Sequence, residues 1–183
     1  MERTADAVVI GGGIVGMSIA HYLAIRGFKK VTLLEKDAVA GGATGVATAV
    51  VRMHYTNPWD PQLALKSREV FENWEDLIGG TCGFTKTGFV FAVGHTETEK
   101  LHKNVEILRD RSGINTYALS GAALQEILPL WNVEDIGAAA IEPDSGYCDP
   151  YAATTSMARR ARELGVSILI GVSATAIRVE GGN

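Results

Sequence analysis

The sequence contains few cysteines and has no strong excess of charge of either sign. Its 183 residues include only two cysteines, Cys82 and Cys148. They are too few and too far apart in sequence for a disulfide framework or a metal cluster, so we expect two reduced thiols in a cytosolic protein. The formal net charge is −4 and no cluster of basic residues is present. This charge pattern argues against a nucleic-acid partner.

Long apolar runs and metal-ligand spacings are also missing. No stretch approaches the roughly 20 apolar residues that span a bilayer. The first apolar strand is expected from about Ala5, which leaves no room for a signal peptide. None of His21, His54, His95 and His102 has metal-ligand spacing with another histidine, a cysteine or a carboxylate. We therefore expect a soluble intracellular protein without a metal centre.

The abundant residues indicate a globular α/β protein. Hydrophobic residues make up 46% of the chain, and 21 residues are glycine. An apolar run over residues 8–10 leads directly into residues 11–16, GGGIVG, and then into a helical pattern that ends at Gly27. A buried strand, a glycine turn and a helix in this order are typical of a dinucleotide-binding βαβ unit. An ordinary βαβ turn without a ligand is the alternative.

Each glycine of this turn has its own expected role. Gly11 allows a sharp turn, Gly13 lets the backbone approach a pyrophosphate, and Gly16 lets the helix lie close to the strand. The phosphates are expected on free N–H groups where the helix begins, at Ile14 and Val15, because the helix dipole favours negative charge there. The turn therefore predicts a diphosphate site.

A carboxylate and a second glycine-rich loop extend this predicted site. A second strand is expected over residues 31–34, and Glu35 lies at its carboxyl end, where it can bind ribose hydroxyls and repel a 2′-phosphate. The loop 41–45, GGATG, then offers the Thr44 hydroxyl and further N–H groups to a phosphate. Two phosphate-contacting loops favour FAD over NAD. A flexible surface loop is the alternative for residues 41–45.

Arg52 is the strongest candidate for contact with a substrate. It is flanked by Val50, Val51 and Met53, and an arginine in an apolar setting is usually paired with, or binds, an anion. It either holds a substrate carboxylate or forms an internal salt bridge. His54 is the one histidine of interest, because it lies two residues after Arg52.

The rest of the chain alternates between helical and β patterns, and its last segment is unusual. Helices are expected over 59–78, 96–111, 120–128 and 150–164, and strands within 84–93, 136–141, 166–170 and 174–179. Ser120 is the expected N-cap of its helix. Residues 180–183, EGGN, read as a turn with no returning strand, and a nucleotide site with two strands is incomplete. We therefore expect the N-terminal part of a longer polypeptide; a naturally short protein is the alternative.

Four stretches taken together resemble one family. They are residues 9–16 with Glu35 and Lys36, residues 42–45 leading to 51–52, residues 87–91, and residues 144–150. In this order they are similar to the N-terminal half of the FAD-dependent oxidoreductases of the D-amino-acid oxidase type. The likeness is greatest to sarcosine oxidase, its beta-subunit relatives and glycine oxidase, and it spans nearly all of the chain.

The resemblance implies an α/β fold with an α+β substrate part. A Rossmann-like FAD-binding domain would comprise residues 1–80 and 149–183, and part of a mostly antiparallel substrate domain would comprise residues 81–148. The resemblance also implies that Arg52 binds the substrate carboxylate. The cofactor-binding residues that it implies are Gly11, Gly13, Ile14, Val15, Gly16, Glu35, Lys36, Gly42, Ala43, Thr44, Gly45 and Ala174.

The activity implied by the resemblance is FAD-dependent oxidation of the C–N bond of a small amino acid or N-methyl amino acid to an imine. Two other readings stay open: a non-catalytic fragment or subunit that needs a partner chain, and an FAD-linked 2-hydroxyacid dehydrogenase. Ala49 stands where some monomeric sarcosine oxidases carry a second arginine. Val46 stands where relatives similar to dimethylglycine dehydrogenase carry a flavin-linking histidine. The family's C-terminal half has no counterpart in these residues.

Overall fold

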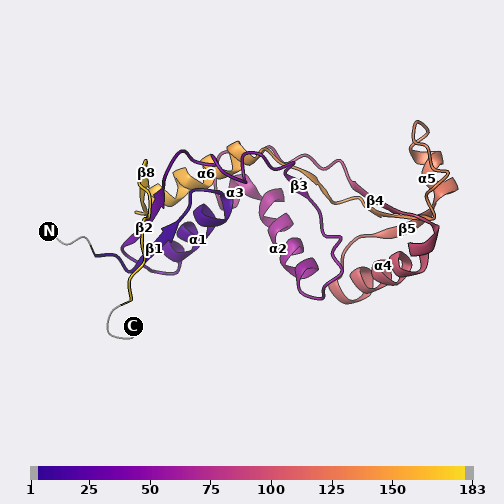
Figure 1. Cartoon of the computed structure of the whole chain (residues 1–183), viewed down its shortest axis with the longest axis horizontal. Coiled ribbons are helices and arrows are strands. Elements are labelled where there is room, and N and C mark those ends of the chain that lie inside the picture. The colour runs from indigo at the N-terminus through magenta and orange to yellow at the C-terminus, as the bar shows by residue number, and fades with distance from the viewer. Residues whose placement is uncertain (1–3, 180–183) are drawn as a thin grey trace. The chain divides into compact units, whose positions relative to one another are not determined.

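The computed structural model describes residues 4–179, which form two compact units (Figure 1). The first unit contains the described residues up to Ala49, residues 74–83 and the described residues from Asp149 onward. The second unit contains residues 50–73 and 84–148. The domain bounds implied by the resemblance, residues 1–80, 81–148 and 149–183, stay a prediction.

A parallel sheet forms the centre of the first unit. Its strands β1 (Ala7–Ile10), β2 (Val31–Glu35) and β8 (Ser167–Ile170) lie in the order β1-β2-β8. Helix α1 (Ile14–Ile25) connects β1 to β2, and α6 (Pro150–Glu163) packs against α1. A strand, a helix and a parallel strand in this order are the βαβ unit of a Rossmann-like fold, so this part of the prediction is confirmed.

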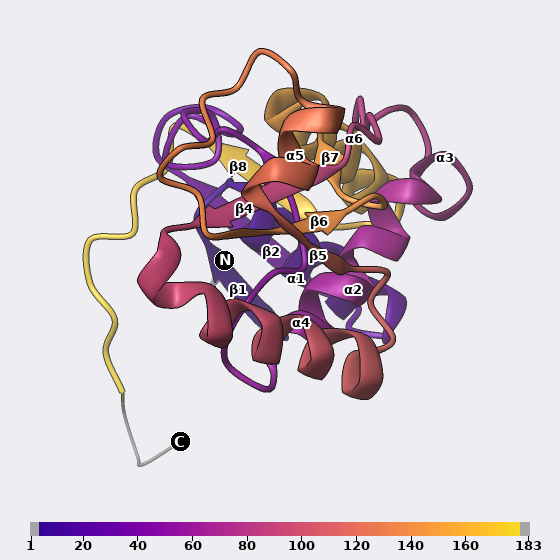
Figure 2. The same ribbon diagram turned by 90° about the vertical axis from the view of Figure 1, so that its right-hand side faces the viewer.

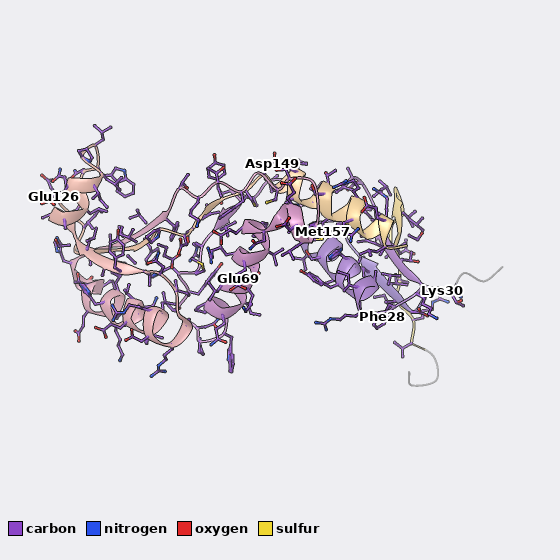
Figure 3. All side chains as sticks on the ribbon, turned by 180° about the vertical axis from the view of Figure 1, so that it is seen from behind. Phe28, Lys30, Glu69, Glu126, Asp149 and Met157 are labelled. Carbon is purple, nitrogen blue, oxygen red and sulfur yellow. The ribbon has the colours of Figure 1, made fainter. Side chains whose placement is uncertain are left out.

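The ends of these helices follow from local sequence. Gly27 comes two residues after the last residue of α1 and has φ = 94°, a left-handed conformation that glycine adopts without strain. At the start of α6 the Asp149 carboxylate accepts hydrogen bonds from the N–H groups of Tyr151 (2.8 Å) and Ala152 (3.0 Å). Pro150 follows as the first helical residue. Figure 3 labels Asp149 at this end of the helix.

An antiparallel sheet with a helix on each face forms most of the second unit. Strands β4 (Phe89–Val93), β6 (Ala138–Glu142) and β5 (Tyr117–Ser120) lie in that order, and β6 pairs antiparallel with both neighbours. Helices α4 (Thr98–Ser112) and α5 (Gly121–Ile127) pack against it. The expected mostly antiparallel part is therefore present, and the Ser120 side chain caps α5 as predicted.

The alternation of residues along β6 explains why two helices cover this sheet. Successive side chains of a strand point to opposite faces. Ala138 and Ala140 pack against α4, whereas Ala139 and Ile141 pack against Leu124 of α5. Figure 2 shows α4 and α5 on the two sides of β6. Leu124 and these four residues of β6 are all buried, and the small alanines let both helices approach the sheet closely.

The second unit also contains a short ribbon and a short 3-10 helix. Strand β3 (Val50–Val51) pairs antiparallel with β7 (Gly146–Tyr147). The 3-10 helix η1 (His95–Glu97) leads into α4. Strands β3, β5 and β7 were not predicted. Within residues 84–93 the structure contains the strand β4 and an isolated bridge from Thr85 to Tyr147, where a pair of short strands was predicted.

The predicted helix over 59–78 is wrong in one respect, because it is two helices. Helix α2 (Asp60–Glu72) ends before Asn73, and α3 (Trp74–Leu77) follows it. The backbone N–H of Asn73 and its side-chain amide both donate to the Glu69 carbonyl, at 3.1 and 2.8 Å. The side chain thereby ends the helix. The apolar pattern gave no sign of this interruption.

The predicted strand over 174–179 is also wrong. These residues form no strand in the structure, and the turn predicted over 180–183 lies outside the described residues. The apolar side chains of Ile177 and Val179 are largely exposed, so the β-rich pattern has no neighbouring strand here to pair with. Among the helices within residues 4–179, none combines the length and the apolar character needed to cross a bilayer.

Candidate functional site

A cleft of about 460 Å³ lies in the first unit, at the carboxyl ends of β1 and β2. In open parallel sheets this is where ligands bind. Of the predicted cofactor-binding residues, the cleft is lined by Gly11, Gly13, Glu35, Lys36, Gly42, Ala43, Thr44 and Ala174. It is also lined by Ile10, Gly12, Leu34, Asp37, Gly41, Val172 and Ser173, which the prediction missed. The predicted residues Ile14, Val15, Gly16 and Gly45 are not part of this lining.

The glycine turn has the geometry that the sequence predicted. Gly11 has φ = 108°, which places the turn in the region that favours glycine. A Cβ on Gly16 would lie 2.0 Å from the Gly11 carbonyl oxygen and 3.6 Å from Cγ1 of Val9 on β1. Gly16 therefore lets α1 pack directly against the strand and turn that precede it. Val15, by contrast, is 70% exposed.

Glu35 anchors the carboxyl end of β2 to the glycine turn. Its Oε2 accepts a hydrogen bond from the Gly12 N–H (2.6 Å), and its Oε1 accepts one from the Asp37 N–H (2.8 Å). These bonds, first that from Asp37 and then that from Gly12, lower the pKa of Glu35. The side chain is an anion with further lone pairs, so sugar hydroxyls can still donate to it.

The second loop is bonded to the glycine turn. The Ala40 N–H donates to the Gly12 carbonyl (3.0 Å), and the Ile14 N–H donates to Thr44 Oγ1 (3.1 Å). A Cβ on Gly13 would lie only 2.8 Å from that same hydroxyl. The first N–H groups of a helix have no acceptor within the helix and carry its positive dipole end. Amide and hydroxyl donors beside an accepting carboxylate suit the phosphates and the ribose of a dinucleotide.

Two further contacts explain the roles of Ala174 and Gly45. The Val172 N–H donates to the Glu35 carbonyl (2.9 Å), which holds the segment with Ala174 beside the end of β2. A Cβ on Gly45 would lie 2.3 Å from the Ala40 carbonyl oxygen and 2.6 Å from the Tyr151 hydroxyl. Gly45 is therefore needed for the packing of the loop, which explains its absence from the lining of the cleft.

Arg52 lies in the second unit, one residue after β3, and is half-buried. Its Nη1 donates to the backbone carbonyl of His54. The guanidinium carbon lies 4.4 Å from the centre of the Tyr55 ring and 5.5 Å from that of Phe89. Among residues 4–179, no carboxylate forms an ion pair with it. The internal salt bridge that was one alternative for Arg52 is not found in the part of the chain that the structure describes.

His54 is buried beside Arg52 and is neutral at pH 7. Its ring stacks on Phe91 with centroids 4.7 Å apart, and its Nε2 lies 3.3 Å from the Asn104 amide nitrogen. Burial, and then the charge of Arg52, lowers the pKa of His54 to about 4. Its Nδ1 lies 3.8 Å from Oε1 of Glu142. This is too long for a hydrogen bond, and a neutral imidazole forms no ion pair.

Glu142 is a fully buried acid that the sequence analysis missed. Its Oε2 accepts hydrogen bonds from the Met53 N–H and the Ser145 hydroxyl, both at 2.9 Å. Burial raises the pKa of Glu142, and these two donors, followed by the charge of Arg52, counteract the rise only in part. The one signal in the sequence is a glutamate that directly follows the apolar run Ala138–Ile141.

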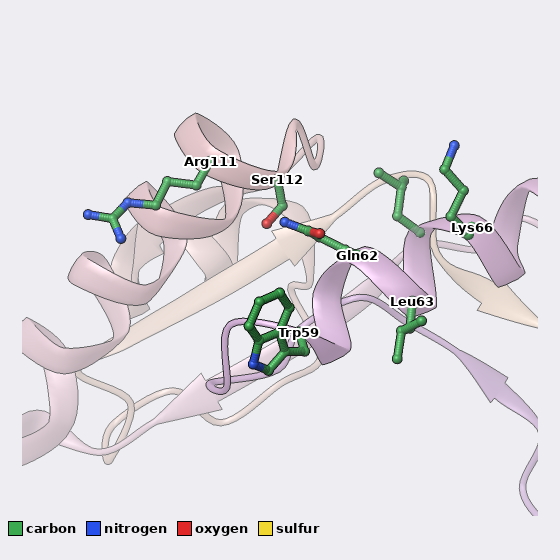
Figure 4. A pocket seen from close by; sticks show the side chains of 7 residues that line it. Trp59, Gln62, Leu63, Lys66, Arg111 and Ser112 are labelled. Carbon is green, nitrogen blue, oxygen red and sulfur yellow. The ribbon is translucent and has the colours of Figure 1, made fainter.

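A metal centre and a second groove are further candidates for a site within residues 4–179. Within residues 4–179, no group of three or more His, Cys, Asp or Glu side chains could hold a metal ion. A groove of about 470 Å³ in the second unit is lined by Trp59, Gln62, Leu63, Leu65, Lys66, Arg111 and Ser112 (Figure 4). Lys66 is paired with Glu69 at 2.9 Å. None of the residues predicted for cofactor or substrate lines this groove.

We predict that Glu142→Gln makes the protein more sensitive to acid. With its lowered pKa, His54 destabilises the fold as pH falls below 6.5, because the unfolded chain takes up the proton first. Glu142 has a raised pKa and opposes this loss down to pH 4.5. The free energy of unfolding of Glu142→Gln should therefore fall by about 2 kcal/mol between pH 6.5 and 4.5. The fall in the parent should be smaller, because Glu142 offsets part of it.

Thermal unfolding at several pH values between 7 and 4.5 measures this difference. The control is Asp144→Asn, because Asp144 is two residues away and its pKa is lowered from 3.8 by Asn115, which places its titration below this range. Parallel stability curves for the parent and Glu142→Gln would show that the two buried groups do not oppose one another.

Comparisons with known proteins identify the family of the chain. A family model described as "FAD dependent oxidoreductase" matches residues 6–183. The chain is 28% identical over 174 residues to mitochondrial dimethylglycine dehydrogenase of Rattus norvegicus, which covers 95% of this chain and 20% of that protein. It is 24% identical over 188 residues to sarcosine oxidase subunit beta of Rhodobacter capsulatus, which covers 99% of this chain and 45% of that protein.

Solved structures show the same relationship. L-proline dehydrogenase from P. horikoshii superposes with a TM-score of 0.87 and 30% identity, over 99% of this chain and 48% of that chain. Glycine oxidase from Bacillus cereus superposes with a TM-score of 0.75 and 27% identity, over 97% of this chain and 49% of that chain. The chain thus spans between a fifth and a half of the length of these relatives. The matched family model covers nearly the whole chain, and the chain belongs to the FAD dependent oxidoreductase family.

Proposed function

We propose that this chain binds FAD and contributes to the oxidation of the C–N bond of a small amino acid or N-methyl amino acid. The observation that carries the proposal is the cleft at the ends of β1 and β2, where Glu35 and Thr44 are both bonded to the glycine turn. Support also comes from relatives that are named for dimethylglycine, sarcosine, L-proline and glycine.

The residues of the cleft have distinct roles in this proposal. The positive dipole end of α1 and the Gly13 N–H hold the pyrophosphate, because the N–H groups of Gly11, Gly12 and Ile14 already donate to Leu34, Glu35 and Thr44. Glu35 accepts hydrogen bonds from the ribose. Thr44 already accepts the Ile14 N–H, and its own hydroxyl proton remains to be donated to a phosphate oxygen. Lys36 borders the adenine, and the backbone at Ala174 faces the same part of the cofactor.

Arg52 binds the substrate carboxylate in this proposal. FAD held in the cleft would supply a hydride acceptor for the carbon next to the amine nitrogen, and water would hydrolyse the imine product. A guanidinium has five N–H donors in a planar fork that fits a carboxylate. One donor binds the carbonyl of His54, and the rings of Tyr55 and Phe89 lie against the fork. The other donors are left for the substrate.

A titration of the full-length protein with FAD tests the cofactor site. We expect Glu35→Ala to weaken binding by about 10- to 100-fold, because the ribose loses its acceptor and the turn loses a charged anchor at Gly12. Asp37→Asn is the matched control, since Asp37 lines the same cleft and its carboxylate, within residues 4–179, pairs with the exposed Lys36 at 3.7 Å. We expect it to change binding by less than about threefold.

The result that contradicts the cofactor site is equal FAD affinity in the parent and both variants. The substrate class is tested separately by anaerobic reduction of the bound flavin. Sarcosine, L-proline and glycine should bleach the flavin, and lactate should not. Reduction by lactate alone would favour the 2-hydroxyacid dehydrogenase.

One observation favours a second candidate, a subunit or fragment that needs further polypeptide for activity. Several apolar side chains of β1 and α1 are exposed, among them Val8 and Ile10 at 55% and Val15 at 70%. Such side chains are usually covered in a finished protein when they occur together. A colourless and aggregating 183-residue product, which becomes yellow only with additional polypeptide, would support this candidate.

A further inference from the structure

We propose that Glu142 is a positioning residue that holds Arg52 in the geometry that binds a carboxylate. The inference rests on the proposed role of Arg52 and adds a residue to that same site. Glu142 does not touch the substrate in this scheme. It acts on the backbone that carries the guanidinium, through its hydrogen bond with Met53.

The backbone at Arg52 leaves the sheet just before the guanidinium. The pairing of β3 with β7 consists of Val50 with Tyr147 and Val51 with Gly146, and Arg52 is the next residue. At Met53 the backbone N–H donates to Oε2 of Glu142 (2.9 Å). The carboxyl group thus restrains the chain where the ladder of backbone hydrogen bonds has ended.

Glu142 is itself fixed, which makes it suitable as an anchor. It is the last residue of β6 and is completely buried, and the Ser145 hydroxyl donates to the same oxygen that accepts the Met53 N–H. In the sheet it is paired with Phe89 of β4, whose ring lies against Arg52. Two adjacent residues of one sheet therefore fix both the backbone and the packing surface of the guanidinium.

His54 transmits this restraint to the guanidinium. Its carbonyl accepts the hydrogen bond from Arg52 Nη1, and its ring is held by Phe91 and Asn104. Met53 is the residue between the two partners of that hydrogen bond. If the Met53 N–H loses its acceptor, the backbone between Arg52 and His54 is freed, and the fork loses its fixed direction.

The experiment compares Glu142→Leu with Glu142→Gln in the full-length, FAD-loaded protein. Leucine fills a similar volume but offers no acceptor, so we expect KM for sarcosine or L-proline to rise about tenfold, with kcat and flavin content nearly unchanged. Glutamine can accept from Met53 and Ser145 as glutamate does and should stay within about threefold of the parent. Asp144→Asn removes a half-buried carboxylate on the same turn, one that pairs with Lys86 and Asn115, and it should change neither constant.

A second measurement is independent of turnover. Hydrogen exchange of the Met53 amide should be slow in the parent and in Glu142→Gln and fast in Glu142→Leu. If Glu142→Leu does not fold, Ser145→Ala decides: a rise in KM of about threefold supports the anchor, and an unchanged KM overturns it.

Arg52→Met separates this inference from the proposed function. If Arg52→Met leaves KM unchanged, the proposed substrate site fails. If Arg52→Met raises KM and folded Glu142→Leu does not, the substrate site stands and the role of Glu142 is overturned.

Discussion

Replacing Gly16 with alanine is expected to destabilise the first unit and abolish FAD binding. The added Cβ would lie 2.0 Å from the carbonyl oxygen and 3.1 Å from the carbonyl carbon of Gly11. Both are backbone atoms of the turn between β1 and α1, so neither can move aside without opening the turn. We expect the free energy of unfolding to fall by about 3 kcal/mol, which is at the upper end of the destabilisation that overpacking causes. This corresponds to a fall in Tm of roughly 6–12 °C.

Gly42→Ala is the matched control for this substitution. Gly42 lines the same cleft, but among the described residues no atom lies within 4 Å of a Cβ built there. We expect its Tm to change by less than about 2 °C. Thermal unfolding and FAD titration of the parent and both variants make the comparison. Equal stability of Gly16→Ala and Gly42→Ala would show that α1 does not need to pack so closely on the turn.

Arg52→Met is expected to raise KM for the amino-acid substrate by about 100-fold, since a charge-assisted fork to a carboxylate contributes a few kcal/mol. The FAD content should not change, because Arg52 belongs to the second unit and the cofactor cleft to the first. Methionine preserves the apolar length of the side chain against Tyr55 and Phe89. Steady-state kinetics and the flavin absorbance of the purified protein measure the two quantities.

The control for Arg52→Met is Arg109→Met. Arg109 is exposed on α4 and pairs with Asp110 at 2.8 Å, so its loss should alter neither KM nor FAD content. Arg52→Lys should give an intermediate KM, because an ammonium keeps the charge but not the planar fork. A KM that is the same for the parent and Arg52→Met would remove Arg52 from the substrate site.

The parts of the fold that the sequence predicted well depend on neighbours in the chain. The βαβ unit from β1 to β2 is such a part, because the backbone geometry of the turn itself explains why glycine is needed at Gly11 and Gly16. Ser120 caps the start of α5, and Gly27 follows the end of α1, each through geometry within a few residues. The glycine turn and Glu35 lie at the carboxyl ends of adjacent strands, so much of the cofactor cleft followed from the same pattern.

What the sequence did not predict depends on partners far away along the chain. The buried role of Glu142 comes from Met53, which is 89 residues away. The break at Asn73 comes from a side chain that competes with the helix, within an apolar pattern that continues across it. Residues 174–179 have the composition of a strand, yet the structure gives them no strand partner. Gly12 was missed because its contact with the Glu35 side chain is visible only in three dimensions.

The position of β8 beside β2 has a consequence for synthesis of the protein on the ribosome. Glu35 pairs with Ile170, about 135 residues later in the chain, and the whole second unit is translated between them. The central sheet of the first unit therefore cannot be completed while the nascent chain is short, whereas the second unit can already fold. β2 keeps an unpaired edge during this interval, when a chaperone would protect it from association with other strands.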